Sequence, residues 1–116
     1  MIKINVDEGY AFDFLAILNV KSKRNKDILT PHNECRDFLI SQIGDELFLE
    51  IESSEEYKSL LDINELIFET IDKLKKGDVE AAYVDNLNYE RFIHKKKIQD
   101  KFFDKGQSEI KIGYGK

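Results

Sequence analysis

The chain has few cysteines, and this limits the class of protein it can be. Cys35 is the only cysteine among 116 residues. One cysteine cannot form an internal disulfide, so the sequence does not belong to the disulfide-stapled class of small secreted domains. Nothing else indicates an oxidising environment. We therefore expect a protein of the cytoplasm.

Long hydrophobic runs are also missing. The longest strongly apolar stretch, residues 14–18, is far shorter than the roughly 20 residues that a membrane-spanning helix needs. The first residues, Met-Ile-Lys-Ile-Asn, do not combine a basic segment with an apolar run, as an export signal would. We expect neither membrane insertion nor export.

The residues that build common catalytic and metal sites are scarce as well. No glycine-rich phosphate loop precedes a candidate helix, and His32 and His94 are the only histidines. A structural zinc site needs four ligands, which His32 and Cys35 cannot supply by themselves. The sequence therefore assigns no catalytic residues and implies no cofactor.

Hydrophobic and charged residues occur together in proportions typical of amphipathic helices. Apolar residues make up 41% of the chain and charged residues 35%, so helices with one buried face and one charged face are expected. A chain of this length builds one core. We predict a single helical domain, residues 1–116, that is mainly α and forms a bundle of four or five helices.

Helical periodicity and capping residues place these helices. The predicted segments are 10–24 after the cap Asp7, 31–43 between the cap Thr30 and Gly44, 54–76 between the cap Ser53 and Gly77, and 79–102 after the cap Asp78. Residues 85–88 are a candidate break in the last segment. Residues 45–52 fit either a strand or a helix, and we favour a helical or irregular connector.

The two ends of the chain alternate like short strands. Ile2, Ile4 and Val6 alternate with polar residues, and so do Ile110 and Ile112. Short strands are unstable alone, so we predict a small two-stranded element in which the ends pair within one chain or across a dimer.

Three separated segments of the chain share sequence patterns with a known protein family. Residues 9–21, GYAFDFLAILNVK, resemble the family's opening pattern GELxDKITILEIK, with Gly9, Asp13, Ile17, Leu18 and Lys21 in common. Residues 63–75, INELIFETIDKLK, resemble VNxxLWxIEDxIR through Asn64, Phe68, Asp72 and Lys75. A third family segment aligns with Tyr89, Ile98, Phe102, Gly106, Ser108, Lys111 and Tyr114. Together these segments resemble a family of small uncharacterised proteins from bacteria and phages. The resemblance implies a compact helical domain and supplies no mechanism.

Four carboxylates suggest an enzymatic alternative. Glu52 with Glu55, and Glu69 with Asp72, follow the E-x-x-E and E-x-x-D spacing of all-α nucleotide pyrophosphohydrolases. Such pairs on facing helices hold Mg²⁺ and present water to a triphosphate. With 23 acidic residues in the chain, solvated acids near a helix start explain the same pattern and are favoured.

A basic segment suggests contact with phosphates. Residues 89–116 contain eight Lys or Arg and four Asp or Glu, whereas residues 1–88 contain ten and nineteen. The candidate phosphate contacts are Arg91, Lys95, Lys96 and Lys97. The net charge of −5 argues against nucleic acid, and a lysine run is usually a solvated helix face.

Polar residues also interrupt apolar helix segments. Asp13, Lys21, Asn64 and Asp72 form either a ligand site or, as we favour, hydrogen bonds and ion pairs between two helices. No active-site pattern accompanies the segregated charge. We therefore expect a non-enzymatic binding or assembly module that associates with itself, as a homodimer, or with another protein.

Overall fold

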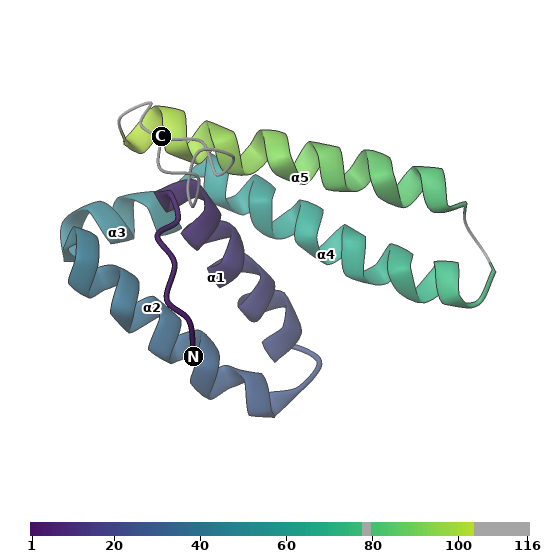
Figure 1. Ribbon diagram of the computed structural model, residues 1–116, viewed down its shortest axis with the longest axis horizontal. Coiled ribbons are helices and arrows are strands. Elements are labelled where there is room, and N and C mark those ends of the chain that lie inside the picture. Colours follow the sequence, from purple (N-terminus) through teal and green to yellow (C-terminus); the bar gives the residue numbers. More distant parts are fainter. Residues whose placement is uncertain (78–79, 104–116) are drawn as a thin grey trace.

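Helices account for nearly all regular structure in the part of the chain that is described. The computed structural model describes residues 1–77 and 80–103. They form α1 (Glu8–Ser22), a short 3₁₀ turn η1 (Lys26–Ile28), α2 (Leu29–Ile43), α3 (Asp45–Glu52), α4 (Glu55–Lys75) and α5 (Ala81–Phe102), as Figure 1 shows. The predicted mainly α bundle is confirmed.

Helices α4 and α5 form a long antiparallel hairpin, and α1 lies between this hairpin and the α2–α3 pair (Figure 1). Helix α1 packs against α2, α4 and α5. It is therefore the central element of the bundle.

The predicted cap of α1 is confirmed, because the carboxylate of Asp7 accepts a hydrogen bond of 2.9 Å from the amide of Tyr10. The predicted cap of α2 is wrong. Asn25 instead caps η1 by accepting from the amide of Asp27, and η1 continues directly into α2. Thr30 consequently lies inside α2, which has no side-chain cap of its own.

The start of α4 needs a similar correction of one residue. The hydroxyl of Ser54, rather than that of Ser53, accepts from the amide of Tyr57 at 3.1 Å. Ser53 donates its hydroxyl to the Leu49 carbonyl at 2.8 Å and closes α3. The helical alternative for residues 45–52 is confirmed, because these residues form α3 and Ser53 is its C-cap.

Two glycines end helices where the sequence placed them. Gly44 and Gly77 have φ angles of 91° and 79°, a conformation that other residues rarely adopt. Gly44 allows α3 to follow α2 at once.

Helix α5 is continuous, so the candidate break at residues 85–88 is not present. Within this stretch Leu87 is buried, and the side-chain amide of Asn88 donates back to the Val84 carbonyl at 3.2 Å. Packing of Leu87 overrides the weak helix propensity of its polar neighbours. The predicted cap Asp78 lies outside the described residues.

The predicted N-terminal strand is not present. Residues 1–7 are neither strand nor helix before α1 begins, and the side chains of Ile2 and Ile4 are exposed. Alternation defines two faces, but a strand also needs a partner with which to pair. Its predicted partner, around Ile110 and Ile112, lies outside the described residues.

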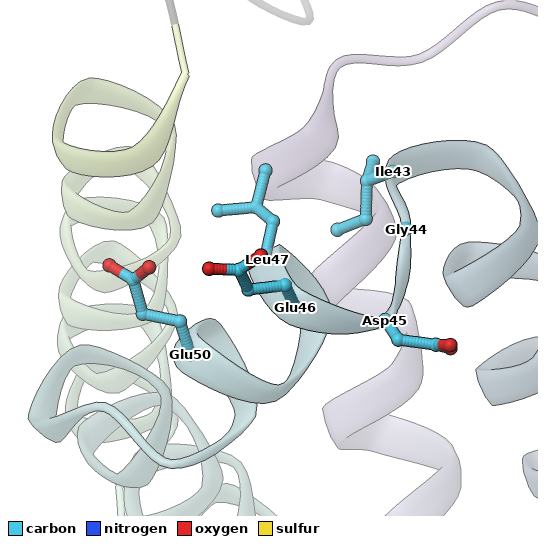
Figure 2. A pocket seen from close by; sticks show the side chains of 6 residues that line it. All are labelled: Ile43, Gly44, Asp45, Glu46, Leu47 and Glu50. Carbon is cyan, nitrogen blue, oxygen red and sulfur yellow. The ribbon is translucent and has the colours of Figure 1, made fainter.

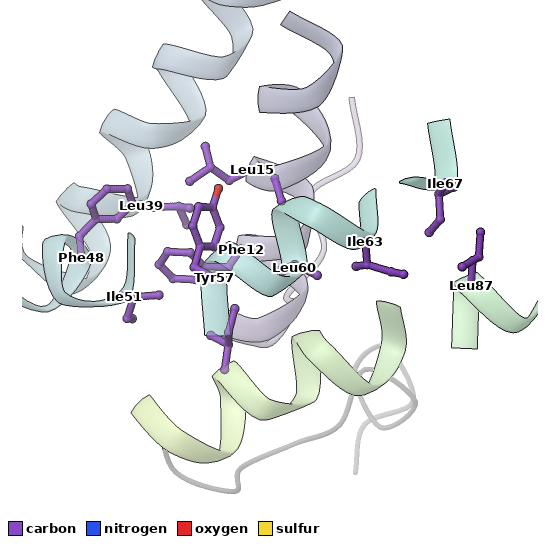
Figure 3. Close-up of a cluster of buried hydrophobic side chains, with 12 residues drawn as sticks. Phe12, Leu15, Leu39, Phe48, Ile51, Tyr57, Leu60, Ile63, Ile67 and Leu87 are labelled. Atoms are coloured by element: carbon purple, nitrogen blue, oxygen red, sulfur yellow. The ribbon is translucent and has the colours of Figure 1, made fainter. Parts of the chain in front are cut away.

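The core is centred on Phe12, in the middle of the bundle. Its ring lies 5.7 Å from that of Phe48 and 5.9 Å, edge-on, from that of Tyr57. Burial raises the pKa of Tyr57 well above its usual value. Figure 3 shows the core continuing along α4 to Ile67 and Leu87, between α4 and α5.

Helix α1 meets α5 at unusually close range where α1 starts. A Cβ atom added to Gly9 would lie 2.6 Å from the Lys95 carbonyl oxygen. The amide of Gly9 donates to Gln99 Oε1 at 2.7 Å, and Gln99 Nε2 donates to Glu8 at 2.9 Å. Only glycine lets the two backbones approach in this way.

We expect Gly9→Ala to destabilise the protein. The added methyl group forces α1 away from Lys95, at a cost of about 1–3 kcal/mol that exceeds the gain in helix propensity of about 1 kcal/mol. Urea denaturation followed by circular dichroism measures the difference. Lys21→Ala, at an exposed position of the same helix, is the control and should change stability by less than about 0.5 kcal/mol. Equal stability of Gly9→Ala and wild type would contradict the close approach.

Candidate functional site

A buried carboxylate lies where α1, α4 and α5 meet. Asp13 of α1 is 3% exposed and Asn64 of α4 is 1% exposed. The side-chain amide of Asn64 donates to Asp13 Oδ1 at 3.0 Å and to the Leu60 carbonyl at 3.0 Å. The structure thus brings together two of the four polar residues singled out from the sequence.

A third residue, which the sequence assigned to a different role, completes this group. Arg91 Nε of α5 lies 3.2 Å from Asp13 Oδ2, and the side chain of Arg91 is 29% exposed. The other side of the guanidinium donates to Asn88 at 3.4 Å. We call Asp13, Asn64 and Arg91 the polar junction.

The polar junction consists of groups that satisfy one another. Each oxygen of Asp13 has its own partner, one in α4 and one in α5. In the described residues every buried side-chain nitrogen and oxygen has a hydrogen-bond partner. A ligand would have to displace these contacts, so the chemistry of the junction is that of a structural link between three helices.

Lys21 and Asp72 do not join the junction. Lys21 lies at the exposed end of α1, and Asp72 lies on the exposed side of α4. Lys21 is eight residues beyond Asp13 in α1, and Asp72 is eight residues beyond Asn64 in α4, so each lies about 12 Å further along its helix axis. Both side chains are exposed at these positions.

The four carboxylates of the magnesium hypothesis are not gathered either. Glu55 and Glu69 lie in the same helix, α4, about 21 Å apart along its axis, and cannot face each other. Glu52, at the end of α3, accepts two hydrogen bonds of 2.9 Å from Arg36, which raise the pKa of that guanidinium. Within residues 1–77 and 80–103 no three potential ligands are placed to hold a metal ion.

The basic cluster of α5 is divided between the inside and the outside of the bundle. Arg91 is bound in the polar junction, and Lys95 is buried. Lys96 and Lys97 are exposed. Lys101 donates to Glu56 at 2.9 Å and lowers the pKa of that carboxyl. The four candidate phosphate contacts therefore do not form one surface.

An open depression lies at the corner between α2 and α3. Figure 2 shows its lining residues, Ile43, Gly44, Asp45, Glu46, Leu47 and Glu50. Its three carboxylates point outward in different directions around the α3 start (Figure 2). The depression has no buried polar group with which to orient a ligand, so it is a weak candidate site.

A more informative surface is formed by exposed aromatic residues of α1 and α5. Tyr10 and Phe14 of α1 are 40% and 51% exposed, and Tyr89 and Phe92 of α5 are 65% and 36% exposed. The Lys95 ammonium lies 4.9 Å from the centre of the Tyr10 ring and 6.0 Å from that of Phe92, which brings the two helices together at the surface. We call these four aromatic residues the α1–α5 face.

Helical periodicity does not reveal this face, because Phe14, Tyr89 and Phe92 stand at spacings that would equally suit a buried stripe. A usable signal was present. Within residues 9–21 the apolar side chains are not confined to one face of a helix, so one core cannot cover all of them. The surplus side chains, Tyr10 and Phe14, are those left at the surface.

Comparison with known proteins adds no family to this description. No family model matches the chain, and no curated protein or solved structure matches it. None of the described helices combines the length and apolar character needed to cross a bilayer. The candidate site therefore depends on the geometry of this chain alone.

We expect Asp13→Ala and Asn64→Ala each to destabilise the protein by about 2–4 kcal/mol, because each leaves a buried polar partner unpaired. The matched control is Asp72→Ala, at an exposed position of α4, which should shift stability by less than about 0.5 kcal/mol. Thermal and urea unfolding measure all three. A loss for Asp72→Ala as large as that for Asp13→Ala would show that the junction has no special role.

Proposed function

We propose that the protein is a non-enzymatic assembly module that forms a homodimer through the α1–α5 face. The observation that carries the proposal is the exposure of four aromatic side chains on two adjoining helices. Tyrosine and phenylalanine are enriched at the centres of protein interfaces, where their large rings are removed from water. A second copy of the chain would provide that cover.

The character of α1 supports an additional partner. A helix whose apolar side chains are spread around its circumference is normally covered by neighbours on most sides. Here α2, α4 and α5 cover three directions, and the side with Tyr10 and Phe14 remains open to water in a single chain. Burial of apolar area contributes about 25 cal/mol per Å², so covering these rings favours association.

The state of the polar residues supports a structural rather than a catalytic role. Asp13, Asn64 and Arg91 bind one another, and Glu52 binds Arg36. A catalytic acid, base or metal ligand needs a substrate within reach. These groups are occupied by contacts between helices, as expected of residues that hold a bundle together. We further propose a cytoplasmic location, consistent with the lone cysteine.

We expect the purified protein to form dimers in a concentration-dependent manner and Phe14→Ser to weaken them at least about tenfold, since each dimer loses two buried rings. Sedimentation equilibrium measures the dissociation constant. The control is Phe38→Ser on α2, which removes a ring that is 62% exposed, against 51% for Phe14, but lies outside the α1–α5 face.

Two results would contradict the proposal. One is a wild-type protein that stays monomeric up to about 1 mM, which leaves less than about 4 kcal/mol for association. The other is an equal increase of the dissociation constant by Phe14→Ser and Phe38→Ser, which would indicate nonspecific hydrophobic association. Circular dichroism of each variant verifies that the monomer fold is retained.

A further inference from the structure

One row of exposed residues on α5 has an order that can pair with itself. Asp85, Tyr89, Phe92 and Lys96 follow one another at intervals of four, three and four, which places them on one side of the helix. All four are exposed, and Tyr89 is the most exposed aromatic residue of the described helices. We call these residues the α5 stripe.

In chain order the α5 stripe consists of one acid, two aromatic residues and one base. When two such stripes run in opposite directions about their midpoint, Asp85 of one copy lies opposite Lys96 of the other, and Tyr89 lies opposite Phe92. Both ends then carry an ion pair and the centre carries four rings. In a parallel pairing, acid would meet acid and base would meet base, which is unfavourable.

We propose that two copies of the chain dimerise by antiparallel packing of their α5 stripes, with Asp85 of each copy paired to Lys96 of the other. This inference rests on the proposed homodimer and gives it an interface and a register. Charge complementarity between the two ends of the stripe selects a second copy as the partner. Helix α5 spans 22 residues, about 33 Å, which is long enough to hold all these contacts.

The remaining aromatic residues of the α1–α5 face fit the same arrangement. The two-fold axis that relates antiparallel helices is perpendicular to both, so each copy's α1 lies on the same side of the α5 pair. Phe92 and Tyr10 flank the same Lys95 ammonium, so α1 adjoins the stripe directly. Tyr10 and Phe14 of both copies would therefore extend the apolar centre of the interface.

No comparable order surrounds the other strongly exposed ring of the helices, Phe38 of α2. The residues four positions before and after it are Glu34 and Gln42, and those three positions away are Cys35 and Ser41. These four helical neighbours of Phe38 include one acid but no aromatic residue and no base, so an antiparallel copy would place no base opposite Glu34. The α5 stripe is thus better ordered for pairing with itself than the surface around Phe38.

Charge reversal tests the register, because Asp85 and Lys96 are exposed and their replacement leaves the monomer core intact. Asp85→Lys and Lys96→Asp each place like charges opposite one another twice per dimer, and each is expected to raise the dissociation constant about tenfold. The double variant Asp85→Lys with Lys96→Asp restores opposite charges only in the antiparallel register. It should return the dissociation constant to within about threefold of wild type.

The matched control is Asp62→Lys, an exposed acid on α4 outside the α5 stripe, which should leave dimerisation unchanged. Sedimentation equilibrium at low and high salt follows all variants, and the single-variant effect should shrink at high salt. Two results would overturn the register while leaving the homodimer intact. Either both single charge reversals leave the dissociation constant unchanged, or the double variant dimerises more weakly than each single variant. A monomeric wild type would overturn both.

Discussion

The burial of one carboxylate is the constraint on which the arrangement of the bundle depends. The side chain of Asp13 in α1 is buried, and an unpaired charge at a buried position destabilises the fold by several kcal/mol. It is satisfied only when Asn64 of α4 and Arg91 of α5 reach its two oxygens together. Three helices are thereby held in one relative position. With Gly9 packed against Lys95, this position determines which side of α5 faces outward.

Part of the uneven distribution of charge along the chain serves contacts between helices. The basic C-terminal part includes α5, and its cations reach acids elsewhere, Arg91 to Asp13 of α1 and Lys101 to Glu56 of α4. Part of the charge asymmetry therefore docks α5 onto the rest of the bundle. Lys96 remains outside, on the surface that carries the exposed rings. Internal ion pairs and the proposed interface use different sides of one helix.

Much of the fold could be predicted because it depends on local signals, such as the Asp7 cap and the positive φ of Gly44. Asn64 stands out in the sequence as a polar residue inside an apolar segment, and its side chain forms a hydrogen bond with Asp13 of another helix. Arg91 could not be assigned to Asp13, because no local pattern specifies which distant base reaches a buried acid. The prediction of an N-terminal strand is wrong for a related reason, since alternation of apolar and polar residues does not supply a second strand with which to pair.

The central claim is that the polar junction orients α5 so that its exposed rings meet those of a second copy. Isotope-filtered nuclear Overhauser spectroscopy on a mixture of labelled and unlabelled protein tests it directly, because it detects only contacts between copies. The account predicts cross-peaks between the Tyr89 ring of one copy and the Phe92 ring of the other. Intermolecular cross-peaks confined to other surfaces, such as that around Phe38, would contradict it.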